Sequence, residues 1–265
     1  NSNGSRLWGT YYGGTGTDRG WSVATDASGN VYMAGETGSS AGIFSTTGFQ
    51  NSNGGGTLDA FIVKFNSSGN RIWGSYYGGS AQEYGYRVAV DPSGNVYLAG
   101  DTKSTLGIAS GGFQNVYGGG QWDLFLVKFN SNGGRLWATY YGSTDLEWYA
   151  SLATDPFGNV YLAGWTNSTS GITSGGFQNV YGGGLWDSFL VKFNSSGNRL
   201  WSTYYGGGSP DVTYGLVTDA SGNIYMSGDS YSSNAIASGG FQNSLSGVED
   251  EYVVKFDPNG NRLCA

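Results

Sequence analysis

The chain has 265 residues with a net charge of −7, and it contains 49 Gly, 20 Tyr, 13 Phe and 9 Trp. An acidic chain lacks the basic footprint of a nucleic-acid binder, and no apolar run approaches the ~20 residues of a membrane-spanning helix. The absence of His excludes His-based triads and His metal ligands, and the single Cys264 excludes an internal disulfide. Abundant Gly with many aromatics favours an all-β fold.

The first predicted strand, residues 6–13, lies within a stretch that recurs along the chain. Its core reads LWGTYYGG at 7–14 and returns as IWGSYYGG at 72–79, LWATYYGS at 136–143 and LWSTYYGG at 200–207. The Trp residues lie 65, 64 and 64 positions apart, and the chain ends in RLCA where a fifth copy would begin. So regular a period predicts a repeat architecture.

Each repeat predicts four strands, A to D. In the second copy these are 87–91, 95–101, 123–130 and 135–142, each rich in β-branched or aromatic residues and bounded by turn residues. Four antiparallel strands per repeat are typical of propeller blades. The expected blades cover about 15–79, 80–143, 144–207, and 208–262 together with 5–14.

The chain ends suggest how such a ring would close. The last repeat has strands A, B and C at 215–219, 223–229 and 251–256, whereas the chain opens with a lone strand D. We expect this N-terminal strand to complete the last blade in place of RLCA, which would remove an open edge. The alternative is four blades of a larger ring.

The strings YGYRVAVDPSGNVYLAGDT and GGFQNVYGGGQWDLFLVKFNSNGGRLWATYYG resemble the bacterial "seven-bladed β-propeller" (SBBP) repeat family. This resemblance covers essentially the whole chain. It implies a secreted or surface-exposed bacterial propeller, and it implies no defined activity. The seven blades of the family name do not carry over to a chain with four repeats.

The connections between strands B and C are long and lie on one face, where binding sites usually form on a rigid scaffold. On these loops the Phe residues 49, 113, 177 and 241 are expected to pack as lids. Gln114 and Gln178, with their counterparts Gln50 and Gln242, are more open and are candidate ligand contacts.

Acidic residues recur on the same long-loop face. Asp18, Glu83, Glu147 and Asp211 precede strand A, and Asp59, Asp123, Asp187 and Asp250 precede strand C. Such rows usually hold loops by accepting backbone hydrogen bonds. The first row could instead form a carboxylate ring that binds a cation such as Ca²⁺.

The basic residues gather at the opposite, short-turn face. Lys64, Lys128, Lys192 and Lys255 end strand C, and an Arg begins each strand D. Beside Asp26, Asp91, Asp155 and Asp219 they are expected to form solvated ion pairs, which leaves an acidic long-loop face and a basic short-turn face.

Tryptophans break the symmetry. Trp122 and Trp186 precede strand C in two repeats, and Trp148 and Trp165 are further candidates on the long-loop face. Exposed Trp beside carboxylates and amides suits sugar binding, because the indole stacks on a pyranose. The alternative is packing between blades. The candidate ligand-binding set is Trp122, Trp165, Trp186, Asp59, Asp123, Asp187, Asp250, Gln114 and Gln178.

Three functions remain open. The first is a non-catalytic module, extracellular or on the cell surface, that binds a glycan or a surface protein and needs no cofactor unless Ca²⁺ is bound. The second is a structural subunit that self-associates by head-to-tail stacking or by exchange of strand D. The third is a carboxylate-based glycosidase or lyase; acidic residues that recur in every blade fit a scaffold better than one catalytic centre.

Overall fold

The computed structural model describes residues 2–45 and 47–265, which form four antiparallel sheets of four strands. Each sheet is one blade, numbered 1 to 4 in chain order. Blade 1 consists of β1 (Asp18–Thr25), β2 (Val31–Thr37), β3 (Asp59–Phe65) and β4 (Arg71–Tyr77). Blade 2 consists of β5 (Glu83–Val90), β6 (Val96–Thr102), β7 (Asp123–Phe129) and β8 (Arg135–Tyr141).

Blade 3 consists of β9 (Glu147–Thr154), β10 (Val160–Thr166), β11 (Asp187–Phe193) and β12 (Arg199–Tyr205). Blade 4 consists of β13 (Asp211–Thr218), β14 (Ile224–Ser230), β15 (Asp250–Phe256) and the short β16 (Arg262–Cys264). The strand order predicted for the second repeat is confirmed. Its strand A begins four residues earlier than predicted, at Glu83, because a β-bulge between Gly85 and Arg87 lets the ladder continue past Tyr86.

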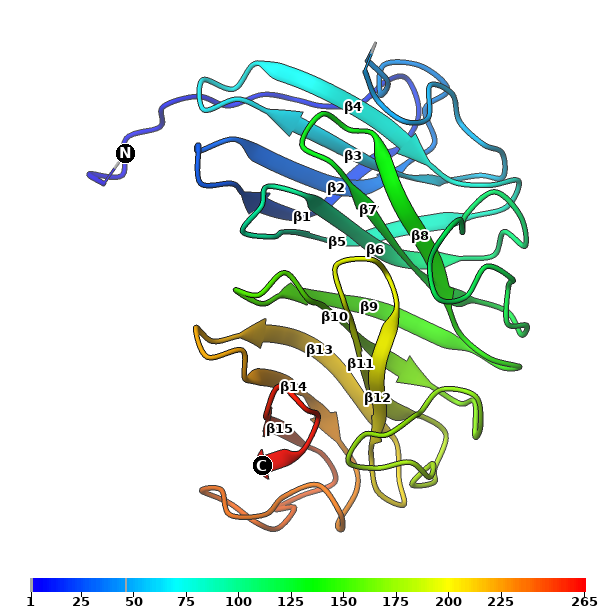
Figure 1. Cartoon of the computed structure of the whole chain (residues 1–265), viewed down its shortest axis with the longest axis vertical. Helices are drawn as coiled ribbons and strands as arrows, with labels where there is room; N and C mark the ends of the chain where they lie inside the picture. Colours follow the sequence, from blue (N-terminus) through cyan, green and yellow to red (C-terminus); the bar gives the residue numbers. More distant parts are fainter. Residues whose placement is uncertain (1, 46) are drawn as a thin grey trace.

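The blades follow one another along the long axis of the molecule (Figure 1). The first strands of successive blades contact each other, so β1, β5, β9 and β13 line the inner side of the arc. The short turns between first and second strands all lie at one end, on the left in Figure 1, and the long connections of blades 1 to 3 lie at the other. These two ends are called the short-turn end and the long-loop end below.

The core lies within and between the blades. Strands β3, β7 and β11 are buried along their whole length, whereas β15 alternates between buried and open positions. Each outer strand also anchors the following blade through its Trp: the indole Nε1 of Trp73 donates to the carbonyl of Ser131 at 3.0 Å, and Trp137 and Trp201 repeat this bond one and two blades further on. Neighbouring blades are therefore joined by one repeated contact.

The predicted closure by the N-terminal strand is not present among the described residues. Strand β15 pairs with β16, so RLCA keeps its place in blade 4. The N-terminal segment instead runs along blade 1, and the two chain ends lie at opposite ends of the stack (Figure 1). There Trp8 Nε1 donates to the carbonyl of Ser67 at 3.1 Å, and the Tyr12 hydroxyl donates to Ile43 at 2.6 Å. These are the contacts of an outer strand with the blade that follows it, so residues 6–13 stand where a blade preceding blade 1 would have its last strand.

Candidate functional site

Three positions at the inner corner of the long-loop end differ from blade to blade. They are the second residue of the first strand, its ladder partner on the second strand, and the residue before the third strand. In chain order the triplets are Arg19, Glu36 and Leu58; Tyr84, Asp101 and Trp122; Trp148, Trp165 and Trp186; and Val212, Asp229 and Glu249. The backbone is the same at these positions in all four blades, but the side-chain types differ. This is expected where a functional site is placed on a symmetric fold.

The aromatic members of blades 2 and 3 form one continuous row. Ring centroids are 5.3 Å apart for Tyr84 and Trp122, 6.0 Å for Trp122 and Trp148, and 5.7 Å for Trp148 and Trp165, all three pairs stacked. Trp186 continues the row at 5.0 Å from Trp165, in a tilted arrangement. We call these five residues the aromatic row.

The row contains both buried and accessible rings. Trp122 is only 5% exposed, while Trp148, Trp165 and Trp186 are half-buried. Lys103 covers Trp122, with its ammonium 4.4 Å from the ring centroid. The expectation of an exposed ring is therefore wrong for Trp122, which links the two blades within the row, whereas Trp165 and Trp186 present part of their surface to solvent.

Backbone strain lies directly beside the row. Tyr149 has a φ of 63°, a left-handed conformation that is rare for a bulky residue. Its amide donates to Asp101 of blade 2 at 3.1 Å, and its ring lies 5.3 Å from both Tyr86 and Tyr214. Asp101 is fully buried, and burial raises its pKa well above the ordinary value. Such outliers persist where the surroundings hold them, and they concentrate at functional sites.

The row of Asp residues before the third strands holds loops. Asp123 Oδ2 accepts the amide of Gly118 at 2.6 Å, and Asp59 and Asp187 accept the corresponding glycine amides. All three carboxylates are fully buried; Asp250, in the last blade, is half-buried and accepts the amide of Ser246. The structure therefore places Asp59, Asp123, Asp187 and Asp250 in loop-holding positions and does not bring them into one ligand site.

Buried carboxyl groups face each other at the junctions between blades. A Cβ added to Gly142 would lie 2.5 Å from both Asp123 Oδ1 and Glu147 Oε2, so these two oxygens flank one point. The Oδ1 atoms of Asp59, Asp123 and Asp187 are buried without a hydrogen-bond partner. Burial, with the nearby Glu147 adding to it, raises the pKa of Asp123 to about 8. A junction with such a pKa retains a proton at neutral pH.

The proposed cation ring is not assembled. Glu83 accepts the Gly79 amide and the Thr102 hydroxyl, and Glu147 and Asp211 hold their own loops in the same way. Asp18 accepts the amide of Gly14. Within residues 2–45 and 47–265, no three acidic or Cys side chains are grouped so that they could hold a metal ion. These four carboxylates therefore hold loops, and Ca²⁺ binding stays a prediction.

Gln114 and Gln178 also hold the long loops through hydrogen bonds to the backbone. The side chain of Gln114 donates to the carbonyl of Val116 and accepts the amide of Gly142, which ties the long loop to the end of β8. Gln178 makes the same pair of contacts with Val180 and Gly206. The lid residues Phe49, Phe113 and Phe177 remain 40–42% exposed, and each lies under an Arg of the next blade.

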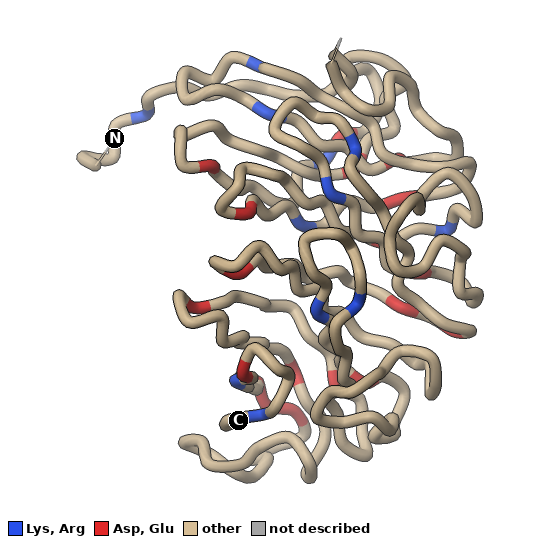
Figure 2. Tube along the Cα trace, in the orientation of Figure 1, with Lys and Arg blue, Asp and Glu red and all other residues tan. Residues whose placement is uncertain are grey.

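The predicted separation into an acidic long-loop end and a basic short-turn end is not present. Many carboxylates of the long-loop end are buried, and the short-turn end carries its own acidic row, visible at the left of Figure 2. There a cavity of about 760 Å³ is lined by turns of all four blades, with Asp26, Asp91, Asp155 and Asp219. Two of the expected ion pairs are present, Lys64 with Asp26 at 3.5 Å and Lys128 with Asp91 at 3.4 Å, but they are not solvated. Lys64, Lys128 and Lys192 are 4–7% exposed and donate to backbone carbonyls of the next blade.

The sequence analysis left out Tyr84 and Tyr149, and it named Trp148 as a candidate on the long-loop face without including it in the ligand-binding set. Tyr84 and Trp148 stand directly after the acidic residue that opens the first strand, as Arg19 and Val212 do. Aligning the repeats position by position would have shown that this position varies. The strain at Tyr149 leaves no such signal, because the same bulge occurs in all four blades and its counterparts Gly20, Gly85 and Thr213 do not have a positive φ.

A family model described as a beta-propeller repeat matches residues 7–41, 72–107, 136–172 and 200–234. An uncharacterized WD repeat-containing protein of Acanthamoeba polyphaga mimivirus is 25% identical over 92% of this chain and 22% of its own length. The regulatory protein FlaEY of Caulobacter vibrioides is 29% identical over 63% of this chain and 17% of its own length. The chain thus spans about a fifth of the length of these curated relatives.

A crystal structure of a candidate gluconolactonase aligns with 95% of this chain and 81% of its own, at a TM-score of 0.42 and 16% identity. This likeness is too distant to bear on activity. Among the described residues, no helix is long and apolar enough to cross a membrane.

Proposed function

The chain belongs to the beta-propeller repeat family, and from this premise we propose that it is a non-catalytic binding module, extracellular or on the cell surface, whose aromatic row holds a glycan. The row itself carries the proposal. Aromatic faces stack on the apolar face of sugar rings. Trp148 is stacked between Trp122 and Trp165, so we expect the half-buried Trp186, tilted at the end of the row, to offer its face to a sugar ring, with the partly exposed Trp165 beside it.

The neighbouring carboxylates support binding over catalysis. Glu36 accepts hydrogen bonds from Arg19 at 2.8 Å and from the Trp21 indole at 2.9 Å, and Asp101 accepts the amide of Tyr149. A glycosidase needs two carboxyl groups that reach the scissile bond. These two are instead engaged in holding the inner corners of blades 1 to 3.

The test uses Trp165→Ala and Trp186→Ala, with Phe157→Ala as the matched control. Phe157 is an exposed aromatic residue in the turn at the short-turn end of blade 3. After a glycan array identifies a ligand, calorimetry should show about tenfold weaker binding for each Trp variant, a loss of about 1.4 kcal/mol. The Phe157 variant should bind like the parent chain. An array without hits, or equal losses in all three variants, would contradict the proposal.

A surface protein is the other partner class that the row could accept, since aromatic rings are also enriched at the centres of protein interfaces. Head-to-tail stacking of oppositely charged faces has less support, because the carboxylates of the long-loop end are largely buried.

A further inference from the structure

Four aromatic rings, one from the first strand of each blade, form a line across the blades. Ring centroids are 6.0 Å apart for Trp21 and Tyr86, and 5.3 Å apart both for Tyr86 and Tyr149 and for Tyr149 and Tyr214. In blades 1, 2 and 4 this ring belongs to the residue at the bulge of the first strand. Blade 3 has Ala150 at that position, so its ring comes from the preceding residue.

The backbone of blade 3 differs at the same place. Tyr149 has a φ of 63°, whereas its counterparts Gly20, Gly85 and Thr213 do not have a positive φ. Blade 3 thus differs from the other blades both in which residue carries the ring and in the backbone conformation of that residue. Since a bulky side chain rarely adopts this conformation, it persists only where other contacts hold it.

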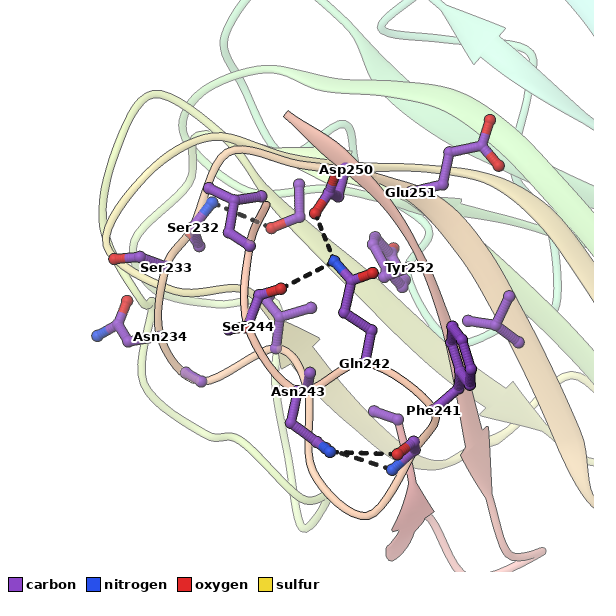
Figure 3. A pocket seen from close by; sticks show the side chains of 18 of the residues that line it. Ser232, Ser233, Asn234, Phe241, Gln242, Asn243, Ser244, Asp250, Glu251 and Tyr252 are labelled. Atoms are coloured by element: carbon purple, nitrogen blue, oxygen red, sulfur yellow. Dashed lines mark hydrogen bonds between the residues drawn. The ribbon is translucent and has the colours of Figure 1, made fainter. Parts of the chain in front are cut away.

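Asp101 of blade 2 supplies such a contact. Its carboxyl group is fully buried and accepts the amide of Tyr149, at 3.1 Å from Oδ1 and 3.4 Å from Oδ2. An acidic residue that holds its own loop looks different: Asp250 accepts the side-chain amide of Gln242 at 2.9 Å within blade 4 (Figure 3). Asp101 instead joins two blades, and the residue that it holds directly follows Trp148.

Trp148 is also held through its indole. The Nε1 of Trp148 donates to the hydroxyl of Tyr86 at 3.4 Å, and the side chain of Tyr86 hydrogen-bonds to Asp101. One buried carboxyl group is therefore connected to Trp148 by two routes, the backbone of the next residue and the indole nitrogen. Trp148 is the middle ring of the aromatic row, stacked between Trp122 and Trp165, so a shift of its ring would disturb both stacked contacts.

We propose that Asp101 is the positioning residue of the glycan site, which holds Trp148 in place and so orders the stacked part of the aromatic row. This inference rests on the proposed function, which assigns the sugar contacts. Asp101 is fully buried and acts through Trp148 on Trp165, whose ring centroid lies 5.0 Å from that of Trp186. The rings are thus ordered before the sugar arrives, which lowers the entropic cost of binding.

The test follows the circular dichroism band that arises when stacked indoles couple, because this band reports the row without a ligand. Trp148→Phe defines the part of the band that needs the middle indole. Asp101→Ala should lose most of that part, and should bind a soluble oligosaccharide identified by the glycan array about fivefold more weakly. Asp101→Asn should keep both the band and the binding. Its side-chain oxygen can still accept the Tyr149 amide, and the amide is neutral, like a carboxyl group whose pKa burial raises well above the ordinary value.

Asp155→Ala is the matched control. Asp155 lies in blade 3, is 1% exposed, and accepts the amides of Phe157 and Asn159, but it lies at the short-turn end, away from the row. Its loss should lower the melting temperature, because two buried amides lose their acceptor, and should leave the band and the binding unchanged. This comparison separates positioning of the row from a general loss of stability.

Tyr86→Phe keeps the aromatic ring and removes only the hydroxyl, so it tests the indole route even where Asp101→Ala does not fold. It should lose a smaller part of the band. Full retention of the band in either variant would overturn the proposal, and so would a lost band with unchanged glycan binding. An array without hits contradicts the glycan site, whereas the band still decides whether Asp101 positions Trp148.

Discussion

Blades 3 and 4 are built from the same repeat, but their outer strands differ in length: β12 has seven residues and β16 has three. Blade 3 lies between two neighbours, has a complete outer strand, and carries three Trp residues at its inner corner. Blade 4 ends in a three-residue strand, has Val212, Asp229 and Glu249 at the same corner, and exposes β15. The difference shows that a blade is buried by its neighbours as much as by its own strands.

The largest contrast is expected from cavity-forming substitutions at one shared position. Leu190→Ala in blade 3 removes a fully buried side chain and should cost about 3 kcal/mol of unfolding free energy. Val253→Ala in blade 4 should cost about 0.5 kcal/mol or less, because that side chain is 64% exposed. Urea denaturation at low protein concentration measures both. Equal costs would show that the open end of blade 4 is covered in solution.

A smaller contrast is expected from added methyl groups. A Cβ at Gly206 would lie 2.4 Å from Asp187 Oδ1 within the junction of blades 3 and 4, so Gly206→Ala should cost about 2 kcal/mol by overpacking. Gly247 in the long loop of blade 4 has no atom within 4 Å of an added Cβ, and Gly247→Ala should leave the melting temperature nearly unchanged. A tolerated Gly206→Ala would mean that the buried carboxyl groups move easily.

The smallest contrast concerns pH. Burial, with Asp211 adding to it, raises the pKa of Asp187 from 3.8 to about 7. The folded chain therefore binds a proton that the unfolded chain has released, and this contribution is complete below about pH 4 and lost as the pH rises through about 7. The melting temperature should fall between pH 5 and pH 8, because Asp59 and Asp123 act in the same direction.

Asp187→Asn should reduce the loss of unfolding free energy between pH 5 and pH 8 by about 1 kcal/mol, since an amide keeps the hydrogen bonding without the charge. Asp250→Asn in blade 4 is the matched control, because Asp250 is half-buried whereas Asp187 is fully buried, and this variant should keep the pH dependence of the parent chain. A pH profile unaffected by Asp187→Asn would show that the junction between blades 3 and 4 does not hold the proton.

The repeat period and the strand pattern were sufficient to predict four-stranded blades, because both signals are local in the sequence. The inner corner was only partly predictable: Trp165 and Trp186 were found as Trp residues that break the repeat, but stacking into a row depends on which blades become neighbours. The burial of Asp59, Asp123 and Asp187 under glycine loops could not be predicted. The sequence does not distinguish an Asp that accepts a backbone amide in the interior from one that faces solvent. Closure was mispredicted because the outer strand has two partners, its own blade and the next.

The bond from each outer-strand Trp to the following blade has a consequence for how such chains change in length. The same bond reaches the turn between the third and fourth strands of the next blade from Trp8, Trp73, Trp137 and Trp201. Each bond involves two neighbouring blades only, so it does not depend on the number of blades in the chain. Duplication or loss of one 64-residue unit therefore creates no new kind of junction. Arrays of this architecture can therefore differ in length by whole repeats while every junction keeps the same contact.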